Sequence, residues 1–122
     1  MSNPKVSAIR REQKESLLMK EISQLFLTAS LDDSSLRGLF INRVTLSPSK
    51  SVCYVFFYSE DGEKVFNEKL ESLKLYKPSL RKAISQMKGR YAPEIVFKYD
   101  HQFEKQQKIE NLLEKIKREE KL

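Results

Sequence analysis

Residues able to do chemistry are sparse in this chain of 122 residues, and they form no catalytic pattern. His101 is the only histidine and Cys53 the only cysteine. General acid–base catalysis by His101 would need a partner within reach, and the sequence suggests none, so an exposed or capping histidine is the simpler interpretation. A reactive thiol needs exposure and a cationic neighbour, whereas Cys53 lies in the most apolar run of the chain. We therefore expect a buried structural thiol.

Metal and cofactor motifs are also missing from the sequence. One Cys and one His cannot provide the ligand spacing of a zinc site. The two acid-rich turns, Asp32-Asp33 and Glu60-Asp61-Gly62-Glu63, lack the spacing of oxygen ligands and are better explained as helix caps and solvated loops. With three glycines in all, the chain has neither a P-loop nor a GxGxxG pattern. We expect no cofactor, no metal, no small-molecule substrate and no enzymatic activity.

Charge is the strongly biased property of the chain. The protein has 23 Lys and Arg against 17 Asp and Glu, a net charge of +6. The segment from Lys64 to Arg90, called the basic segment below, holds eight cations against only Glu68 and Glu71, so it accounts for the whole excess. Two acids cannot neutralise eight cations by pairing within a helix. This imbalance favours an anionic docking surface, above all for nucleic acid, over a merely solvated helix face.

A helix and two strands are predicted ahead of the basic segment. Residues 1–9 are expected to form a mobile arm, because Pro4 disfavours an early helix. An apolar stripe of helical period then runs from about Arg10 to Ala29. Two runs rich in β-formers follow, and the short turn between them predicts an antiparallel hairpin. The first run, 39–46, places Phe40, Val44 and Leu46 on one face, while the second, 52–58, is apolar on both faces like a central strand.

The basic segment itself predicts two short helices that meet at a bend, Tyr76-Lys77-Pro78-Ser79. Pro78 suits the first turn of the second helix, and Gly89 is a natural C-terminal cap. A third strand alternates over 94–99, and a C-terminal helix from about Phe103 to Glu120 has a thin apolar stripe and nearly balanced charge. The order α-β-β-α-α-β plus a final helix predicts a two-layer α+β sandwich. In it, a right-handed crossover would pair the first and third strands in parallel.

The length fits a single domain. We divide the chain into the arm at 1–9, a nucleic-acid-binding domain at 10–100 and a helical extension at 101–122. A lone cysteine fits a reducing compartment, no apolar run approaches the roughly 20 residues of a membrane span, and the N-terminus lacks the apolar stretch of a secretory signal. We expect a cytoplasmic monomer without a membrane partner.

Several short motifs occur together in one order between residues 8 and 116. They are Arg10-Arg11 before an amphipathic helix, the strand and turn at 40–48, the aromatic strand at 52–57, Leu80-Arg81 before a basic helix, the sequence RYAPEIVF at 90–97 (against R-x-x-P-E-L-x-F), and Tyr99-Asp100 with Ile109, Leu112 and Leu113 downstream. Together they resemble the ribosome-binding factor A (RbfA) family of bacterial assembly factors, which have a type II KH-like fold. The resemblance departs at the bend, where the family has Ala-x-Gly and this chain has Tyr76-Lys77-Pro78.

This resemblance implies a protein that binds the immature 30S small ribosomal subunit and assists 16S rRNA maturation near the 5′ end without catalysis. The RNA contacts would come from cations around the bend, namely Lys74, Lys77, Arg81, Lys82, Lys88 and Arg90, with Arg10 and Arg11 as second choices. Tyr76 and Tyr91 could stack on an unpaired base, although packing in the core is the favoured role for each. The C-terminal helix would be loosely docked or partly free, or would contact ribosomal protein or rRNA.

Two other functions compete with this expectation. A generic KH-like module for single-stranded nucleic acid is weakened by the missing GxxG loop, through which such domains approach RNA. A protein–protein adaptor could use the same basic face for an acidic partner.

Overall fold

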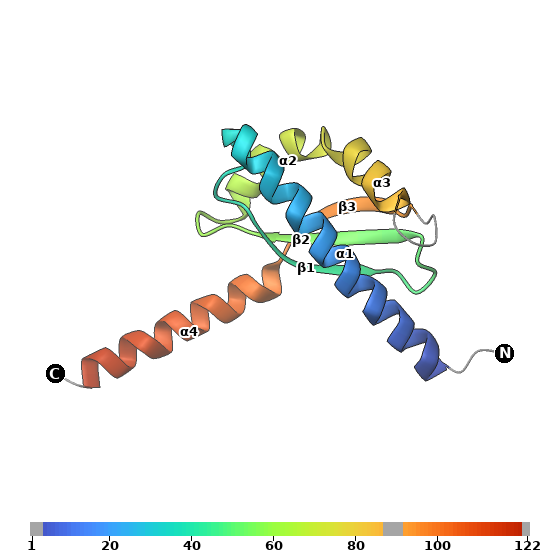
Figure 1. Cartoon of the computed structure of the whole chain (residues 1–122). Helices are drawn as coiled ribbons and strands as arrows, with labels where there is room; N and C mark the ends of the chain where they lie inside the picture. The colour runs from blue at the N-terminus through green and yellow to red at the C-terminus, as the bar shows by residue number, and fades with distance from the viewer. Residues whose placement is uncertain (1–3, 87–91, 121–122) are drawn as a thin grey trace.

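The computed structural model describes residues 4–86 and 92–120. Its elements follow the predicted order, with one short 3₁₀ turn (η1) added (Figure 1): α1 Pro4–Asp32, η1 Ser34–Leu36, β1 Phe40–Leu46, β2 Val52–Tyr58, α2 Glu63–Lys74, α3 Lys77–Ser85, β3 Glu94–Tyr99 and α4 His101–Glu120. The α+β class is confirmed. Within the described parts of the chain, no helix is long and apolar enough to cross a membrane.

The sheet has the strand order β1-β2-β3, and one predicted pairing is wrong. The hairpin of β1 and β2 is antiparallel and β2 is central, as predicted. The parallel pair, however, is β2 with β3 and not β1 with β3, so helices α2 and α3 cross over between neighbouring strands. The outer edge of β1 is already covered at one point, because the N–H of Leu46 donates to the Glu15 carboxylate of α1 at 2.6 Å. The returning chain therefore pairs with the free edge of β2, which is also the shorter connection.

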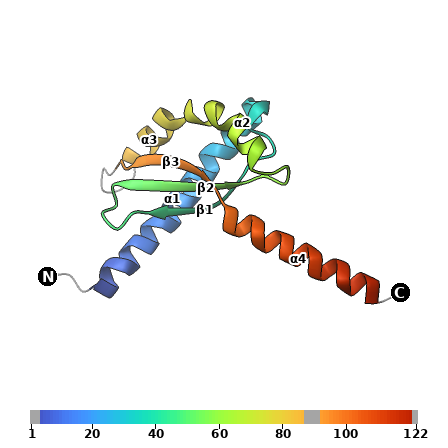
Figure 2. The same cartoon turned by 180° about the vertical axis from the view of Figure 1, so that it is seen from behind.

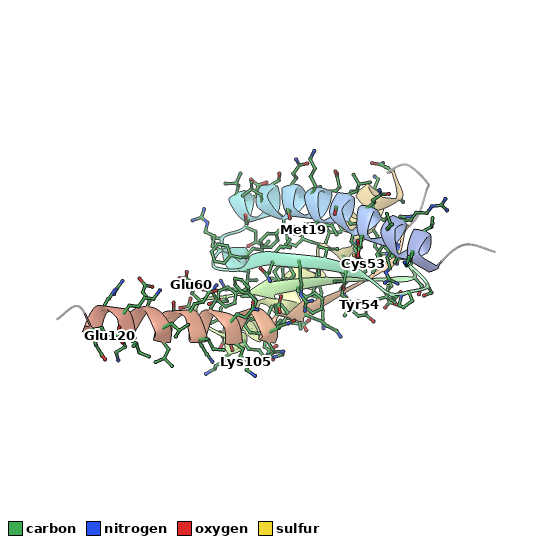
Figure 3. The ribbon with its side chains drawn as sticks, turned by 90° about the horizontal axis from the view of Figure 1, so that it is seen from below. Met19, Cys53, Tyr54, Glu60, Lys105 and Glu120 are labelled. Atoms are coloured by element: carbon green, nitrogen blue, oxygen red, sulfur yellow. The ribbon has the colours of Figure 1, made fainter. Side chains whose placement is uncertain are left out.

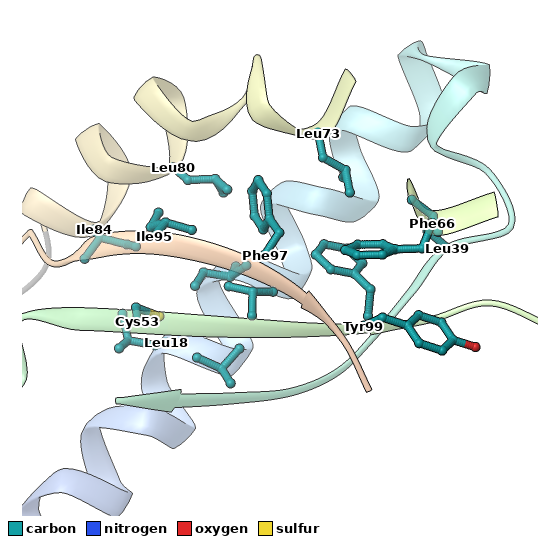
Figure 4. Packing of buried hydrophobic residues seen from close by; sticks show 14 of the residues in the cluster. Leu18, Leu39, Cys53, Phe66, Leu73, Leu80, Ile84, Ile95, Phe97 and Tyr99 are labelled. Carbon is teal, nitrogen blue, oxygen red and sulfur yellow. The ribbon is translucent and has the colours of Figure 1, made fainter. Parts of the chain in front are cut away.

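All three helices that precede β3 lie on one face of the sheet (Figures 1 and 2). The alternation of β3 is as predicted, with its odd-numbered residues buried. In β2, which is apolar on both faces, Cys53, Val55 and Phe57 point into the helical layer and the residues between them are half-buried. Phe57 lies at the centre of the core, where its ring centroid is 5.4 Å from Phe26 and 5.5 Å from Phe97. Figure 4 shows other members of the core, among them Leu73, Leu80 and Phe97, packed between the strands and the helices. The buried apolar residues are Leu18, Ile22, Leu36, Leu39, Val44, Leu46, Cys53, Val55, Phe57, Phe66, Leu73, Leu80, Ile84, Ile95, Phe97 and Tyr99.

Because of a β-bulge in β1, the prediction that Phe40 shares a face with Val44 and Leu46 is wrong. Ile41 is paired with Phe57 but Arg43 with Phe56, so Asn42 is an extra residue without an opposite partner. Such a bulge shifts the alternation of side chains by one position. Val44 and Leu46 are buried as predicted, whereas Phe40 falls on the opposite side of the sheet and is 55% exposed.

Helix α1 begins at Pro4, six residues before the predicted start. Proline is compatible with the first turn of a helix, where its missing N–H is not needed. Residues 4–9 are therefore helical rather than an arm, and residues 1–3 lie outside the described part of the chain. The N-terminal part of α1 extends past the sheet (Figure 1), which explains why its periodic apolar contacts begin only further along.

Helix α4 is attached to the domain through its first turn. Asp100 precedes the helix, and its Oδ1 accepts a hydrogen bond from the N–H of Phe103 at 3.1 Å. The Phe103 ring packs edge-on against Tyr58, with centroids 4.8 Å apart. Beyond this turn the helix extends away from the sheet (Figures 1 and 2). Its predicted stripe, Ile109, Leu112, Leu113 and Ile116, is between 43% and 59% exposed, as expected of a partly free helix.

Candidate nucleic-acid interface

The bend predicted in the basic segment lies between α2 and α3. It comes one residue earlier than predicted: Leu75 and Tyr76 link the two helices with right-handed helical backbone angles, whereas Lys77, Pro78 and Ser79 already belong to α3. Their N–H groups bond to the carbonyl oxygens of Ser72 and Leu73 at 3.3 and 3.0 Å, so α2 ends in a tighter turn. Pro78 occupies the second position of α3, where no donor is required. The bend needs no positive φ angle, which is why this chain can form it without the small residues of the Ala-x-Gly pattern.

Tyr76 has a structural role at this bend. Its hydroxyl donates to Oδ2 of Asp33 at 3.0 Å, and its ring packs against the hydrophobic core. Asp33 also accepts from the N–H and hydroxyl of Ser35, at 3.0 and 2.6 Å, and thereby caps the short η1 turn. These hydrogen bonds, first from Ser35 and then from Tyr76, lower the pKa of Asp33. The packing role favoured for Tyr76 is confirmed, and Tyr91 lies outside the described residues.

Three of the predicted cations come together in one groove. Lys77, Arg81 and Lys82 line it from α3, and the start of β3 forms the opposite wall, with Ala92, Glu94 and Ile95. The neighbouring α3 residues Leu80 and Ile84 are buried in the core. Because a helix has 3.6 residues per turn, the cations at 77, 81 and 82 then lie on its outer side.

Lys77 is held more firmly than the other two. Its ammonium nitrogen lies 5.4 Å from the centre of the Phe97 ring, a cation–π distance that keeps the charge at the head of the groove. Arg81 and Lys82 are exposed. The groove thus combines one positioned ammonium group with two side chains that can adapt to phosphate oxygens.

The other predicted contacts are more dispersed. Lys74 is the last residue of α2, beside the bend, and its Nζ lies 3.4 Å from the exposed Glu71 carboxylate. Such a surface pair holds the lysine only weakly. Arg10 and Arg11 lie in the N-terminal third of α1 and are not among the residues that line the groove. Lys88 and Arg90 lie outside the described residues.

One cation of the basic segment has a structural partner that its sequence position does not reveal. The ammonium group of Lys69 donates to the backbone carbonyl of Arg37, next to Gly38 in the connection from η1 to β1. This contact ties α2 to that connection. Lys69 is therefore less available to an anionic ligand than its place in the basic segment suggests.

Two further cations lie on the sheet face that α1–α3 leave uncovered, and the charge count of the basic segment missed them. The Arg43 guanidinium carbon is 4.0 Å from the Phe56 ring centre, and Lys98 Nζ is 4.6 Å from that of Tyr54. Figure 3 shows Tyr54 on the side of the sheet opposite α1. Both cations come from the edge strands and both rings from β2, so strand pairing brings them together and no local sequence pattern marks them. Arg43 is also bonded to Asp100, so this face is less cationic than the groove.

The residues able to do chemistry lie where the sequence predicted. Cys53 is buried, and that burial, together with the charge of Glu15, raises its pKa to about 12, so the thiol is inert. His101 is exposed, as expected, but it has a partner that the sequence did not suggest, because its Nε2 lies 2.6 Å from Oε2 of Glu63 at the start of α2. Among the described residues, no three His, Cys, Asp or Glu side chains are grouped so that they could hold a metal ion.

Comparison with known proteins now adds to this geometry. The sequence model of the family described as "Ribosome-binding factor A" matches residues 10–113, which include the whole sheet, the bend and the groove. The chain belongs to the ribosome-binding factor A family. The resemblance seen in its motifs is thereby confirmed.

Individual relatives in the family agree. The ribosome-binding factor A of Prochlorococcus marinus (strain AS9601) is 34% identical over 111 residues, which are 88% of this chain and 85% of that protein. The protein of the same name from Halothermothrix orenii is 34% identical over 105 residues, 85% of each chain. The crystal structure of ribosome-binding factor A from Thermus thermophilus superposes with a TM-score of 0.60 at 22% identity. That match covers 73% of this chain and 93% of the other, and it supports the KH-like fold.

Proposed function

We propose that this member of the ribosome-binding factor A family binds the immature 30S small ribosomal subunit through its precursor 16S rRNA. It would act in the cytoplasm as a monomer and assist maturation near the 5′ end of that RNA without bond chemistry. Family membership supports a ribosomal target, and the inert thiol and exposed histidine give no support to catalysis. The observation that carries the RNA contact is the convergence of Lys77, Arg81 and Lys82 along one groove beside the bend.

The mechanism follows from the chemistry of the groove. Ammonium and guanidinium groups would contact phosphate oxygens, and each phosphate neutralised releases counterions, with a salt slope of roughly −0.7 to −0.9 per contact. Structured RNA is recognised largely by its shape, its phosphates and its 2′-hydroxyls, which suits such a surface. By binding one rRNA conformation more tightly than another, the protein would shift the population toward it. Lys74 is placed to extend these contacts across the bend, and Lys88, Arg90, Arg10 and Arg11 remain predicted contacts.

Charge reversal in the groove tests this function. The double variant Arg81→Glu, Lys82→Glu should weaken cosedimentation with small subunits in sucrose gradients and reduce the magnitude of the salt slope by about 1.4 to 1.8. Both side chains are exposed, so the free energy of unfolding should change by no more than about 0.5 kcal/mol per site. Circular dichroism would verify the fold.

A matched control is available on α4. The double variant Lys115→Glu, Lys117→Glu makes the same change in net charge at exposed positions far from the groove. It should retain most of the binding. If both double variants lose binding equally, net charge and not the groove drives the association. Unchanged binding of the Arg81, Lys82 variant would refute the groove as the docking surface.

A further inference from the structure

Leu75 is an apolar side chain placed at the centre of the basic bend. It is 78% exposed, the largest exposed fraction among the large apolar residues of the described chain. Single exposed leucines are common on protein surfaces and need no explanation on their own. Leu75 differs through its position, because it links α2 to α3 and lies between the cations Lys74 and Lys77.

The outward direction of Leu75 is fixed by its neighbours. On one side Leu73 is 2% exposed and belongs to the core, and on the other Tyr76 is turned inward and bonded to Asp33. The N–H of Leu75 is also satisfied, by the carbonyl of Ser72 at 3.3 Å. The bend is therefore held by the residues around Leu75, and the core does not require a leucine side chain there.

The charges around Leu75 indicate what it would meet. Lys77 begins the groove that continues through Arg81 and Lys82, and Lys74 lies on the other side of the bend. An RNA strand whose phosphates follow these cations would pass its bases or riboses over the bend. An apolar side chain at that place can pack against the face of a base that is not covered by a neighbouring base.

We propose that Leu75 is the apolar contact of the bend for an unpaired nucleotide of the bound RNA, while Lys74 and Lys77 hold the flanking phosphates. This inference rests on the proposed function and adds a chemical preference to it. In a bend with a bare glycine the backbone itself can approach the strand. Here a side chain projects from the bend, and the contact depends on an accessible base face. A continuous duplex hides those faces, so Leu75 favours loops, bulges and single-stranded junctions.

Two RNA probes of equal charge test the preference directly. One is a fluorescently labelled hairpin with an unpaired loop, and the other is a blunt duplex with the same number of phosphates. Leu75→Ala should weaken binding to the hairpin by roughly three- to tenfold, at or below the loss of one aromatic–base stack. Binding to the duplex should change less than about twofold, and the salt slope should be unchanged because no phosphate contact is lost.

Two control variants separate the apolar contact from other effects. Leu27→Ala removes the same atoms from α1 at a position that is 63% exposed, and it should bind both probes like the wild type. Lys77→Ala should weaken binding to both probes and reduce the magnitude of the salt slope by about 0.7 to 0.9. Thermal unfolding of each variant verifies that the fold is kept.

The outcomes distinguish this inference from the proposed function. Unchanged hairpin binding by Leu75→Ala, or an equal loss on the duplex, overturns the assignment of Leu75. A wild-type protein that cosediments with small subunits but binds neither free RNA at low salt also overturns it, while the proposed function stands. A wild-type protein that binds neither the subunits nor the RNAs overturns both.

Discussion

At the scale of single residues, Asp100 joins three elements of the fold. Its Oδ2 accepts from Asn42 Nδ2 at 2.7 Å and from Arg43 Nε at 3.0 Å, and its Oδ1 caps α4 through the N–H of Phe103. The carboxylate is 2% exposed. Burial alone would disfavour its charge, but the bonds from Asn42, Phe103 and Arg43 outweigh burial and lower the pKa of Asp100. The sequence marked Asp100 through the family resemblance, but its partner Asn42 could not be predicted, because the bulge that positions Asn42 depends on strand pairing.

Removal of this carboxylate should destabilise the protein. Asp100→Ala leaves the Asn42 and Arg43 donors without an acceptor and uncaps α4, which should cost about 2 to 4 kcal/mol of unfolding free energy. Urea unfolding at pH 7 measures it. The conservative control Asn42→Ala removes one donor only and should cost less. A loss below about 0.5 kcal/mol for Asp100→Ala would show that the network contributes nothing to stability.

The same network predicts a dependence on pH. A carboxyl group whose pKa is lower in the folded than in the unfolded protein stabilises the fold above its unfolded pKa, near 3.9, and loses that contribution as the pH falls through the folded value. The difference in unfolding free energy between wild type and Asp100→Ala should therefore shrink as the pH falls below about 4. Urea titrations from pH 7 to 3 would reveal it, and a constant difference would contradict the ionised state of Asp100.

At the scale of elements, the period of the apolar residues was sufficient to predict most of the fold. It located β2 at 52–58, the two helices of the basic segment and the bend between them, because each depends on local pattern and on Pro78. The predictions that were wrong concern features that depend on contacts between distant parts of the chain. The bulge turned Phe40 outward, and the pairing of β3 with β2 depends on which strand edge is free. The predicted start of α1 was wrong for a different reason. Proline interrupts the interior of a helix but is tolerated in its first turn, so Pro4 can begin the helix.

The attachment of α4 gives a prediction at this scale. A chain truncated after Lys108 keeps Asp100, Phe103 and Glu104, which bond or pack at the start of α4. It loses residues 109–122, which carry the exposed stripe and Asn111 at the edge of a shallow hollow beside Tyr58. Its melting temperature should stay within about 4 °C of the full chain, which corresponds to less than about 1 kcal/mol. Differential scanning calorimetry measures this. A larger fall would mean that the stripe packs on the domain.

At the scale of the whole molecule, the fold places the cations in different surroundings. Lys77, Arg81 and Lys82 gather in the groove beside the bend, Lys69 serves the packing of α2, and Arg10 and Arg11 lie apart on α1. The sequence located the charged segment and the bend, because both are contiguous in the chain. It could not rank the individual cations, because their availability depends on partners such as the Arg37 carbonyl and the Phe97 ring.

Photo-crosslinking from the groove to the small subunit tests the central claim most directly. p-Benzoylphenylalanine in place of Ser85, which lines the groove, would be compared with the same group in place of Glu114 on α4. The account predicts crosslinks from position 85 to precursor 16S rRNA near its 5′ end, which high salt abolishes, and weaker or different crosslinks from position 114. Crosslinks to rRNA from position 114 together with none from position 85 would contradict it.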